Sequence, residues 1–266
     1  KIKRFMTINK VYHLADLHIR NLQRHKEYRL IFKKFLKQVV VDDIQDSVIY
    51  LAGDIAHAKT EMSPELLQEI SWFFTECAKL RETIIITGNH DCNLNNNHRL
   101  DVLTPIIENL KNPRLHYLRD TGVYPIHNLT FVVYSILDDK ENWPKGKDVE
   151  GENTICLFHG PVNKAQTDIG YVVSSNSFQV EMFDGFDMAM LGDIHKRQTF
   201  GKGYEHVAYA GSMVQQNHGE MLEKHGYLLW DIPTRTFTEH HIHNDYGFLT
   251  VDVVDGKIPQ WVYDEV

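Results

Sequence analysis

Five short apolar runs in the sequence each lead into residues that can bind a metal ion. The polar residues that follow the runs are Asp16-Leu17-His18, Gly53-Asp54, Gly88-Asn89-His90-Asp91, His159-Gly160 and Gly192-Asp193-Ile194-His195. Aspartate, histidine and asparagine without thiolate suit borderline to hard divalent ions such as manganese, iron or zinc. One ion needs about four protein ligands. The surplus of candidates predicts two ions about 3.5 to 4 Å apart that share one carboxylate.

Two adjacent divalent ions are suited to one kind of reaction. A hydroxide that bridges the pair can attack phosphorus in line, while the ions stabilise the charge that builds on the phosphoryl oxygens. The pattern therefore predicts hydrolysis of a phosphate ester. Each motif alone has an ordinary structural explanation, such as a capped turn, a tight polar turn or a loop histidine. The occurrence of all five, in order, favours the metal site.

The apolar runs themselves predict the elements that position these residues. Val11 to Ala15, Val48 to Ala52, Thr83 to Thr87, Thr154 to Phe158 and Met188 to Leu191 are continuous rather than alternating, as in strands buried on both faces. Between the first three runs, apolar residues recur at helical spacing, first from Tyr28 to Val40 and then from Leu66 to Cys77, with Ser63 as cap and Pro64 as first residue of the second helix. This order predicts a mostly parallel sheet whose strand ends gather at one edge.

The later part of the chain is less regular. Pro105 interrupts an apolar helical pattern, and we expect the helix to restart there with Thr104 as its cap. From residue 207 onward the pattern changes to short strands, at Val207 to Ala210, Tyr227 to Trp230, Phe237 to Ile242 and Phe248 to Val253. These strands predict a second, more antiparallel sheet packed on the first.

Composition limits the class of protein without naming its function. The chain has 266 residues and a net charge of -8, which two divalent cations would change to -8 + 4 = -4. The three cysteines have no close spacing and predict neither a disulfide framework nor a zinc site. No apolar stretch approaches the roughly 20 residues of a membrane span, and residues 1–10 contain no secretion signal. We expect an intracellular protein, cytoplasmic or nuclear, that does not contact a membrane.

The five motifs look like the five signature blocks of the calcineurin-like metallophosphoesterases, and the resemblance extends from about Val11 to Gln216. It implies a four-layer α-β-β-α sandwich of two mixed sheets flanked by helices, with a core at residues 1–244 and the start of a truncated or minimal capping segment at 245–266. It also implies site roles. Asp16, His18, Asp54 and His195 would hold the first ion, and Asp54, Asn89, His159 and Asp193 the second. His90 would stabilise the transition state or protonate the leaving oxygen, and Asp91 would support the turn.

One position departs from the family pattern. Where the family usually has Gly-His-x-His, this chain has Gly192-Asp193-Ile194-His195. A carboxylate can still bind a hard cation, so Asp193 is kept as a ligand, and the second subsite is expected to prefer manganese or magnesium over zinc. Alternatively, Asp193 only accepts a hydrogen bond from a neighbouring ligand. Manganese is the expected cofactor, with magnesium, iron and zinc as alternatives.

A histidine three residues beyond Asp54 gives a finer resemblance. Gly53-Asp54-Ile55-Ala56-His57 is similar to the SbcD-type nuclease subunits that repair double-strand breaks, in which this histidine helps to position the nucleotide and the catalytic histidine. His57 could equally be an ordinary turn-capping histidine. The resemblance implies metal-dependent exonuclease action on DNA ends, endonuclease action on single strands, a homodimer, and an SbcC-like ABC-type ATPase partner with a long coiled coil.

Local positive charge can reconcile DNA binding with an acidic chain. Arg20 and Arg24 follow the first motif, and Lys196 and Arg197 follow the last. These residues are candidates for contact with sugar and phosphate oxygens, although each alone could be a solvated surface charge. Aromatic platforms for single strands are not evident in these loops. The main rival is a phosphatase or cyclic-nucleotide diesterase for a small substrate, and a metal-stabilised interaction scaffold is the non-enzymatic alternative.

Overall fold

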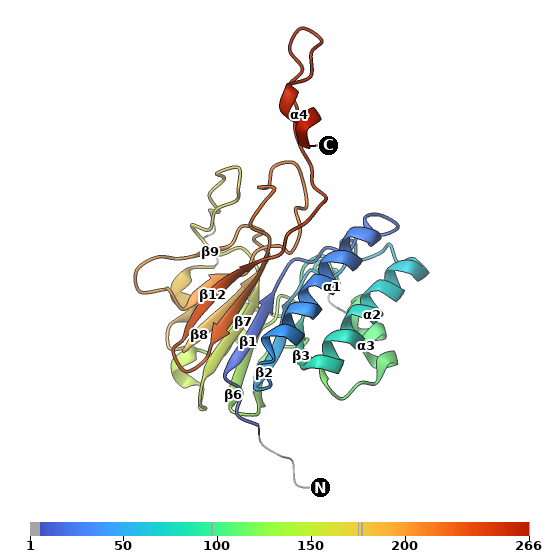
Figure 1. The fold of residues 1–266 in the computed structure, drawn as a ribbon. Coiled ribbons are helices and arrows are strands. Elements are labelled where there is room, and N and C mark those ends of the chain that lie inside the picture. The colour runs from blue at the N-terminus through green and yellow to red at the C-terminus, as the bar shows by residue number, and fades with distance from the viewer. Residues whose placement is uncertain (1–5, 97, 175, 177, 266) are drawn as a thin grey trace.

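The computed structural model describes residues 6–96, 98–174, 176 and 178–265, and within these the chain forms two six-stranded sheets (Figure 1). The first has the order β12-β11-β1-β2-β3-β4 and the second β5-β6-β7-β8-β10-β9. The strands of the first sheet are β1 (Lys10–Leu14), β2 (Ser47–Ala52), β3 (Glu82–Ile86), β4 (Leu115–Tyr117), β11 (Gly226–Asp231) and β12 (Thr236–His241). Those of the second are β5 (Gly122–Ile126), β6 (Leu129–Tyr134), β7 (Thr154–His159), β8 (Met188–Gly192), β9 (Gln198–Thr199) and β10 (Val207–Tyr209).

The five motif-bearing strands are buried on both faces, as their continuous apolar runs predict, whereas β5 and β12 contain exposed residues. In β1, Val11 packs between the two sheets and Tyr12 packs toward the helices, and both are fully buried. The helices α1 (His25–Asp42), α2 (Pro64–Leu80) and α3 (Leu103–Leu110) cover the outer face of the first sheet (Figure 1). The rings of Phe32 and Phe73 stack at 4.1 Å where α1 and α2 meet. This layer fixes the ends of β1, β2 and β3.

The outer face of the second sheet is covered by loops and three short 3-10 helices, η1 (Lys140–Asn142), η2 (Gly146–Asp148) and η3 (Val180–Phe183). Aromatic side chains hold this cover in place, because Trp143 stacks on Tyr134 at 4.7 Å and on Phe178 at 5.9 Å. The two mixed sheets flanked by helices confirm the predicted fold class.

The strand order corrects two of the sequence-based expectations. The five motif-bearing runs do not belong to one sheet, since β1, β2 and β3 lie in the first sheet and β7 and β8 in the second. The later strands also form no sheet of their own. β11 and β12 extend the first sheet antiparallel to β1, and β10 runs parallel to β8 in the second. These strands widen both sheets. The strand ends that carry the motifs meet at the interface between the two sheets, which we call the seam.

Helix ends follow local hydrogen bonding more closely than the sequence pattern suggests. The predicted cap at Ser63 is confirmed, because its hydroxyl accepts from the backbone N–H of Leu66 at 3.2 Å. The predicted cap at Thr104 is wrong. The carboxylate of Asp101 accepts from the backbone N–H groups of Leu103 and Thr104 at 3.0 and 2.8 Å, so α3 begins earlier. Val40, expected on the apolar face of α1, is 57% exposed.

The C-terminal segment leaves the body of the molecule, and its helix α4 (Gln260–Glu265) stands apart from the sheets (Figure 1). Residues 248–253, predicted as a strand, form neither a strand nor a helix.

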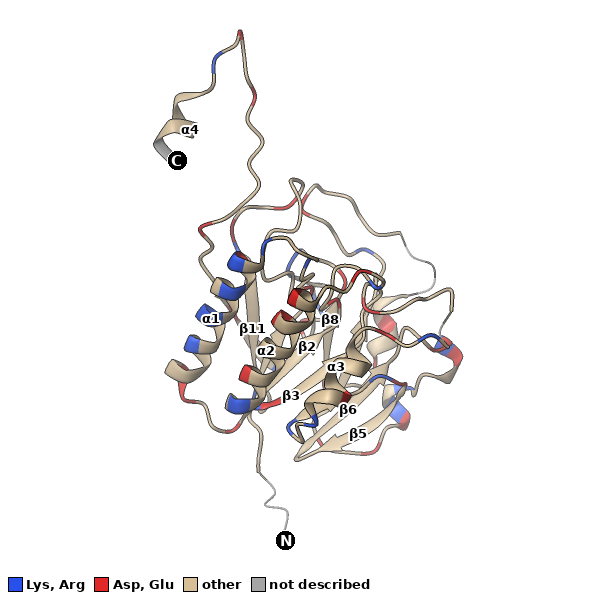
Figure 2. Ribbon diagram, turned by 90° about the vertical axis from the view of Figure 1, so that its right-hand side faces the viewer, with Lys and Arg blue, Asp and Glu red and all other residues tan. Residues whose placement is uncertain are grey.

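All three cysteines are buried and unpaired. Among the helices described here, none has the length and apolar content needed to cross a bilayer. In Figure 2, Lys and Arg positions recur along α1, whereas Asp and Glu mark α2.

Candidate metal centre

The carboxyl ends of five strands bring the predicted ligands together. Asp16 and His18 follow β1, Asp54 follows β2, Asn89 follows β3, His159 ends β7, and Asp193 and His195 follow β8. Across the seam, β2 contacts both β7 and β8. Four of these residues have left-handed backbone conformations, with φ of 53° at Asp16, 45° at His18, 51° at Asp54 and 100° at Asp193. Such conformations are costly for non-glycine residues and persist only where the surroundings impose them, which is common at functional sites.

The first group of ligand atoms comes from Asp16, His18 and His195, whose donor atoms lie within 4.8 Å of one another. The Nε2 atoms of His18 and His195 are 3.0 Å apart. Asp16 is fully buried, and its carboxylate accepts a hydrogen bond from the backbone N–H of Asp193 at 3.0 Å. The turn after β8 is thus tied to the turn after β1.

The second group surrounds the Nε2 atom of His159. This atom lies 3.0 Å from Oδ1 of Asn89, 3.3 Å from Oδ1 of Asp54 and 3.9 Å from Oδ1 of Asp193. The last distance is too long for a hydrogen bond. Metal–ligand bonds of roughly 2.0 to 2.2 Å place two ligands of one ion about 3 to 4 Å apart, so the spacing suits ligation by Asp193. It does not support the alternative in which Asp193 accepts a hydrogen bond from His159.

Asp54 faces both groups at once. Its Oδ2 lies 3.4 Å from Nε2 of His18, while its Oδ1 lies 3.3 Å from Nε2 of His159. A carboxylate that directs one oxygen to each of two ligand groups has the geometry of a bridge between two ions.

The hydrogen bonds on the far sides of the histidines show that the donor set fits cations. Nδ1 of His159 donates to the carbonyl of Ala52 at 2.6 Å, and Nδ1 of His195 donates to the Glu220 carboxylate at 2.7 Å. In the neutral rings, both Nε2 atoms then carry a lone pair. That of His195 faces Nε2 of His18 and that of His159 faces Oδ1 of Asn89, so acceptor atoms point at one another. A divalent ion between these atoms removes the conflict, and a hydrogen-bonded Nδ1–H is the usual arrangement behind a metal-binding Nε2.

The close packing of the ligand groups also shifts the pKa values of their side chains in the metal-free protein. Burial raises the pKa of Asp16 to about 6. Burial would lower the pKa of His195, but the hydrogen bond to Glu220 and the charge of Asp16 raise it to about 9. Burial likewise opposes the charged form of His159, yet the Asp54 carboxylate raises the pKa of this imidazole well above its usual value. Protons therefore occupy the positions that cations would take.

His90 is held at the edge of both groups. Its Nδ1 donates to the carbonyl of His57 at 2.6 Å, and its backbone N–H donates to Oδ1 of Asp54 at 2.8 Å. The ring lies edge-on to His18, with centroids 4.6 Å apart, and stacks on His57 at 5.4 Å. Burial and the nearby Arg20 guanidinium lower the pKa of His57 to about 4. His57 thus accepts a hydrogen bond from His90 through its backbone carbonyl and packs its neutral ring against the ring of His90.

Asp91 supports the turn rather than the ligand groups. Its buried carboxylate accepts from the backbone N–H groups of Gly88, Ala56 and Ile55, at 2.9, 2.9 and 3.3 Å. These bonds join the turn after β3 to the turn after β2. A Cβ atom at Gly88 would collide with the backbone and carboxylate of Asp54, so the turn requires glycine.

A comparison with known families accounts for this arrangement. Residues 9–197 match the model of the calcineurin-like phosphoesterases. The chain belongs to this family. It is 43% identical over 264 residues to an uncharacterized protein of Acanthamoeba polyphaga mimivirus, an alignment that covers 94% of this chain but only 19% of that protein. The fold is similar to that of TT1561 from Thermus thermophilus, with a TM-score of 0.51, 11% identity, and 88% of this chain and 99% of that chain covered.

The basic residues predicted to bind substrate have different surroundings in this phosphoesterase. Lys196 lines a cavity of about 310 Å³ beside Asp193 and His195. Arg20 donates to the carbonyl of Gln216 at 3.0 Å and lies near His57. Arg24 makes a bidentate pair with Glu27 at 2.7 Å.

Arg197 points away from both ligand groups. Its guanidinium donates to the carbonyl of Ala210 at 3.1 Å and pairs with Glu239 of β12 at 3.3 Å. The structure therefore places Lys196 and Arg20 beside the centre and engages Arg24 and Arg197 in contacts that hold the fold together.

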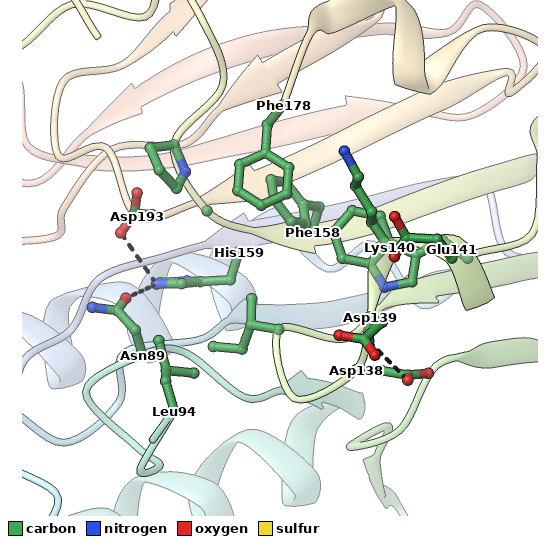
Figure 3. A pocket seen from close by; sticks show the side chains of 14 residues that line it. Asn89, Leu94, Asp138, Asp139, Lys140, Glu141, Phe158, His159, Phe178 and Asp193 are labelled. Carbon is green, nitrogen blue, oxygen red and sulfur yellow. Dashed lines mark hydrogen bonds and ion pairs between the residues drawn. The ribbon is translucent and has the colours of Figure 1, made fainter. Parts of the chain in front are cut away.

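Two features of the phosphoesterase centre are not evident from the motifs. One is a cavity of about 480 Å³ next to Asn89, His159 and Asp193, with Phe178 in its wall (Figure 3). Trp143 lines the same cavity. These aromatic residues come from segments that carry no motif. The other is Glu220, whose only sequence signal is an acidic residue in the polar loop after β10. Both could be found only once the chain was folded.

Proposed function

We propose that this phosphoesterase is a metal-dependent nuclease that hydrolyses phosphodiester bonds in DNA, acting on ends and on single strands. The observation that carries the proposal is the position of Asp54, which directs one carboxylate oxygen to each ligand group and accepts the backbone N–H of His90. Two divalent ions held there would activate water and neutralise charge on the phosphoryl group. Manganese is the proposed metal.

His90 is suited to transfer a proton to the leaving oxygen. Its Nδ1–H is fixed by the carbonyl of His57, so in the imidazolium form the second proton sits on Nε2. A histidine held in one orientation beside the reacting centre is the usual general acid. Asp91 orients the ligands, because its carboxylate binds backbone amides in the turns that carry them.

The support for DNA as substrate is local. His57 stacks with His90 at 5.4 Å, which agrees with the arrangement implied for SbcD-type nucleases. Lys196 and Arg20 lie on the sides of the centre and can contact phosphate oxygens. A homodimer and an ABC-type ATPase partner are part of the same proposal, and size-exclusion chromatography and co-purification with such an ATPase would test them.

The second candidate is hydrolysis of a small phosphate ester. Asp138, Asp139 and Glu141 line the 480 Å³ cavity together with Trp143 and the basic residue Lys140, and the excess of acidic residues repels a polyanion. A cavity of this size and aromatic character can enclose one base or one aromatic leaving group. Its presence favours a mononucleotide or cyclic nucleotide if the nuclease assay fails.

One assay separates the two candidates. The manganese-loaded chain is incubated with linear duplex DNA, single-stranded DNA, a chromogenic phosphomonoester and a cyclic nucleotide, with His90→Asn as the matched control. Cleavage of DNA by the native chain and not by the variant supports the nuclease. Cleavage of the small esters with DNA left intact would overturn the nuclease in favour of the second candidate.

A further inference from the structure

The loop after β10 contains a buried carboxylate that the five motifs do not include. The side chain of Glu220 is 8% exposed. Its Oε1 accepts from Nδ1 of His195 and from Nδ2 of Asn217, both at 2.7 Å, and its Oε2 accepts from the backbone N–H of Gln216 at 2.7 Å. Three donors thus fix a single orientation of this carboxylate.

The orientation of Glu220 determines how His195 is presented. Because the carboxylate holds the proton on Nδ1, the lone pair of Nε2 points toward His18 and the first ligand group. The matching atom of His159 in the second group donates to a neutral backbone carbonyl, that of Ala52. The two groups therefore differ, since the first has an additional negative charge directly behind a ligand.

The same loop is attached to the other segments of the first group. Nε2 of Gln216 donates to the carbonyl of Leu17 at 3.3 Å and lies 3.5 Å from that of Asp16, while Arg20 donates to the carbonyl of Gln216. Nε2 of Gln215 donates to the carbonyl of Glu220 at 3.0 Å. Residues 215–220 consequently contact the segment that carries Asp16 and His18 as well as His195.

We propose that Glu220 is a positioning residue that sets the affinity of the first metal subsite, formed by Asp16, His18, Asp54 and His195, and leaves the second subsite nearly unchanged. The carboxylate makes Nε2 of His195 a better electron donor and holds the ring in the binding orientation. This inference rests on the proposed two-ion centre, but it concerns binding of the metal and not the substrate.

The test is a titration of the metal-free chain with Mn²⁺, with free Mn²⁺ followed by electron paramagnetic resonance. The native chain is expected to bind two ions. Glu220→Ala should weaken one of the two sites by roughly 10- to 100-fold, the usual effect of losing such a partner. Glu220→Gln keeps an oxygen for Nδ1 of His195 and should restore part of that affinity. Glu223→Ala, which removes an exposed carboxylate three residues away, is the matched control.

Three results would overturn the inference: two unchanged sites in Glu220→Ala, equal weakening of both sites, or no recovery in Glu220→Gln. Thermal melting of each metal-free variant shows whether it is folded. Should Glu220→Ala fail to fold, Asn217→Ala removes one donor from the carboxylate and should weaken the same single site less. Two-site binding without DNA cleavage would leave this inference standing while the nuclease proposal fails.

Discussion

The Nε2 atoms of His18 and His195 face each other at 3.0 Å, although 177 residues separate them in the chain. The ring of His195 is held from behind, because its Nδ1 donates to Glu220, and the backbone carbonyl of His18 accepts from the Tyr28 hydroxyl. Two opposed ring nitrogens can share at most one proton between them. The pair is therefore arranged for a cation, and this expectation leads to direct tests.

Replacement of Asp54 should abolish binding of both ions. Its two oxygens face different groups, at 3.4 Å from His18 and 3.3 Å from His159, so Asp54→Ala removes a ligand from each subsite. Isothermal titration with Mn²⁺ would measure the stoichiometry, which should fall from two to less than one at micromolar ion. Asp120→Ala, at an exposed carboxylate, is the control. Loss of a single ion would contradict the bridging role.

His90→Asn should keep both ions and lose turnover. The His90 side chain donates to a backbone carbonyl, and His90 is not one of the residues assigned to either ligand group. Loss of a general acid lowers the rate by roughly 10²- to 10⁴-fold. Parallel measurement of bound Mn²⁺ and of kcat on the best substrate checks this. Equal loss of metal and of turnover would show instead that His90 is a ligand or a structural residue.

Asp193→His should change the choice of metal. The substitution creates the Gly-His-x-His pattern of the family and puts a nitrogen donor in place of the carboxylate oxygen 3.9 Å from His159. Imidazole favours zinc relative to manganese more than carboxylate does. Competition between Zn²⁺ and Mn²⁺ at the second subsite, read as displaced Mn²⁺, should shift toward zinc by about tenfold. An unchanged ratio would place Asp193 outside the coordination sphere.

The metal-free protein should lose stability between pH 6.5 and 9. The pKa of His195 rises to about 9 despite burial, because of Glu220 and Asp16, so the stability that its proton provides is complete below pH 6.5 and lost as the pH passes 9. The pKa values of Asp16 and Asp91, raised by burial to about 6 and 7, act in the same direction at lower pH.

Calorimetry at pH 6.5, 7.5 and 8.5 measures this trend. In EDTA, Tm should fall as the pH rises. The gain in Tm on adding Mn²⁺ should increase over the same range, because the ions displace those protons. A Mn²⁺ effect that is largest at pH 6.5 would show that the protons and the ions do not compete.

The sequence is informative wherever a residue type and its place in a strand are enough. Asp16 and Asp54 follow buried, neighbouring parallel strands, whose ends lie together at one edge of a sheet, whereas His159 ends a buried strand of the other sheet. What it leaves undetermined depends on partners far away in the chain. The capping of α3 by Asp101 in place of Thr104 is a choice between two hydrogen-bonding residues three positions apart. The addition of β11 beside β1 and the approach of Glu220 to His195 result from tertiary packing that no local pattern encodes.

The placement of the five strand ends on two different sheets has a mechanical consequence. Apolar side chains hold the inner faces together, and a hydrogen bond from His159 to the carbonyl of Ala52 crosses between the sheets at 2.6 Å. Asp54 lies on one side of this seam and His159 on the other. Bound ions would act as crosslinks between the layers. Removal of the ions by a chelator should then loosen the edge of the two sheets that carries the ligands before the rest of the sandwich. Amide hydrogen exchange should accelerate more at the carboxyl ends of β2 and β7 than in the middles of these strands.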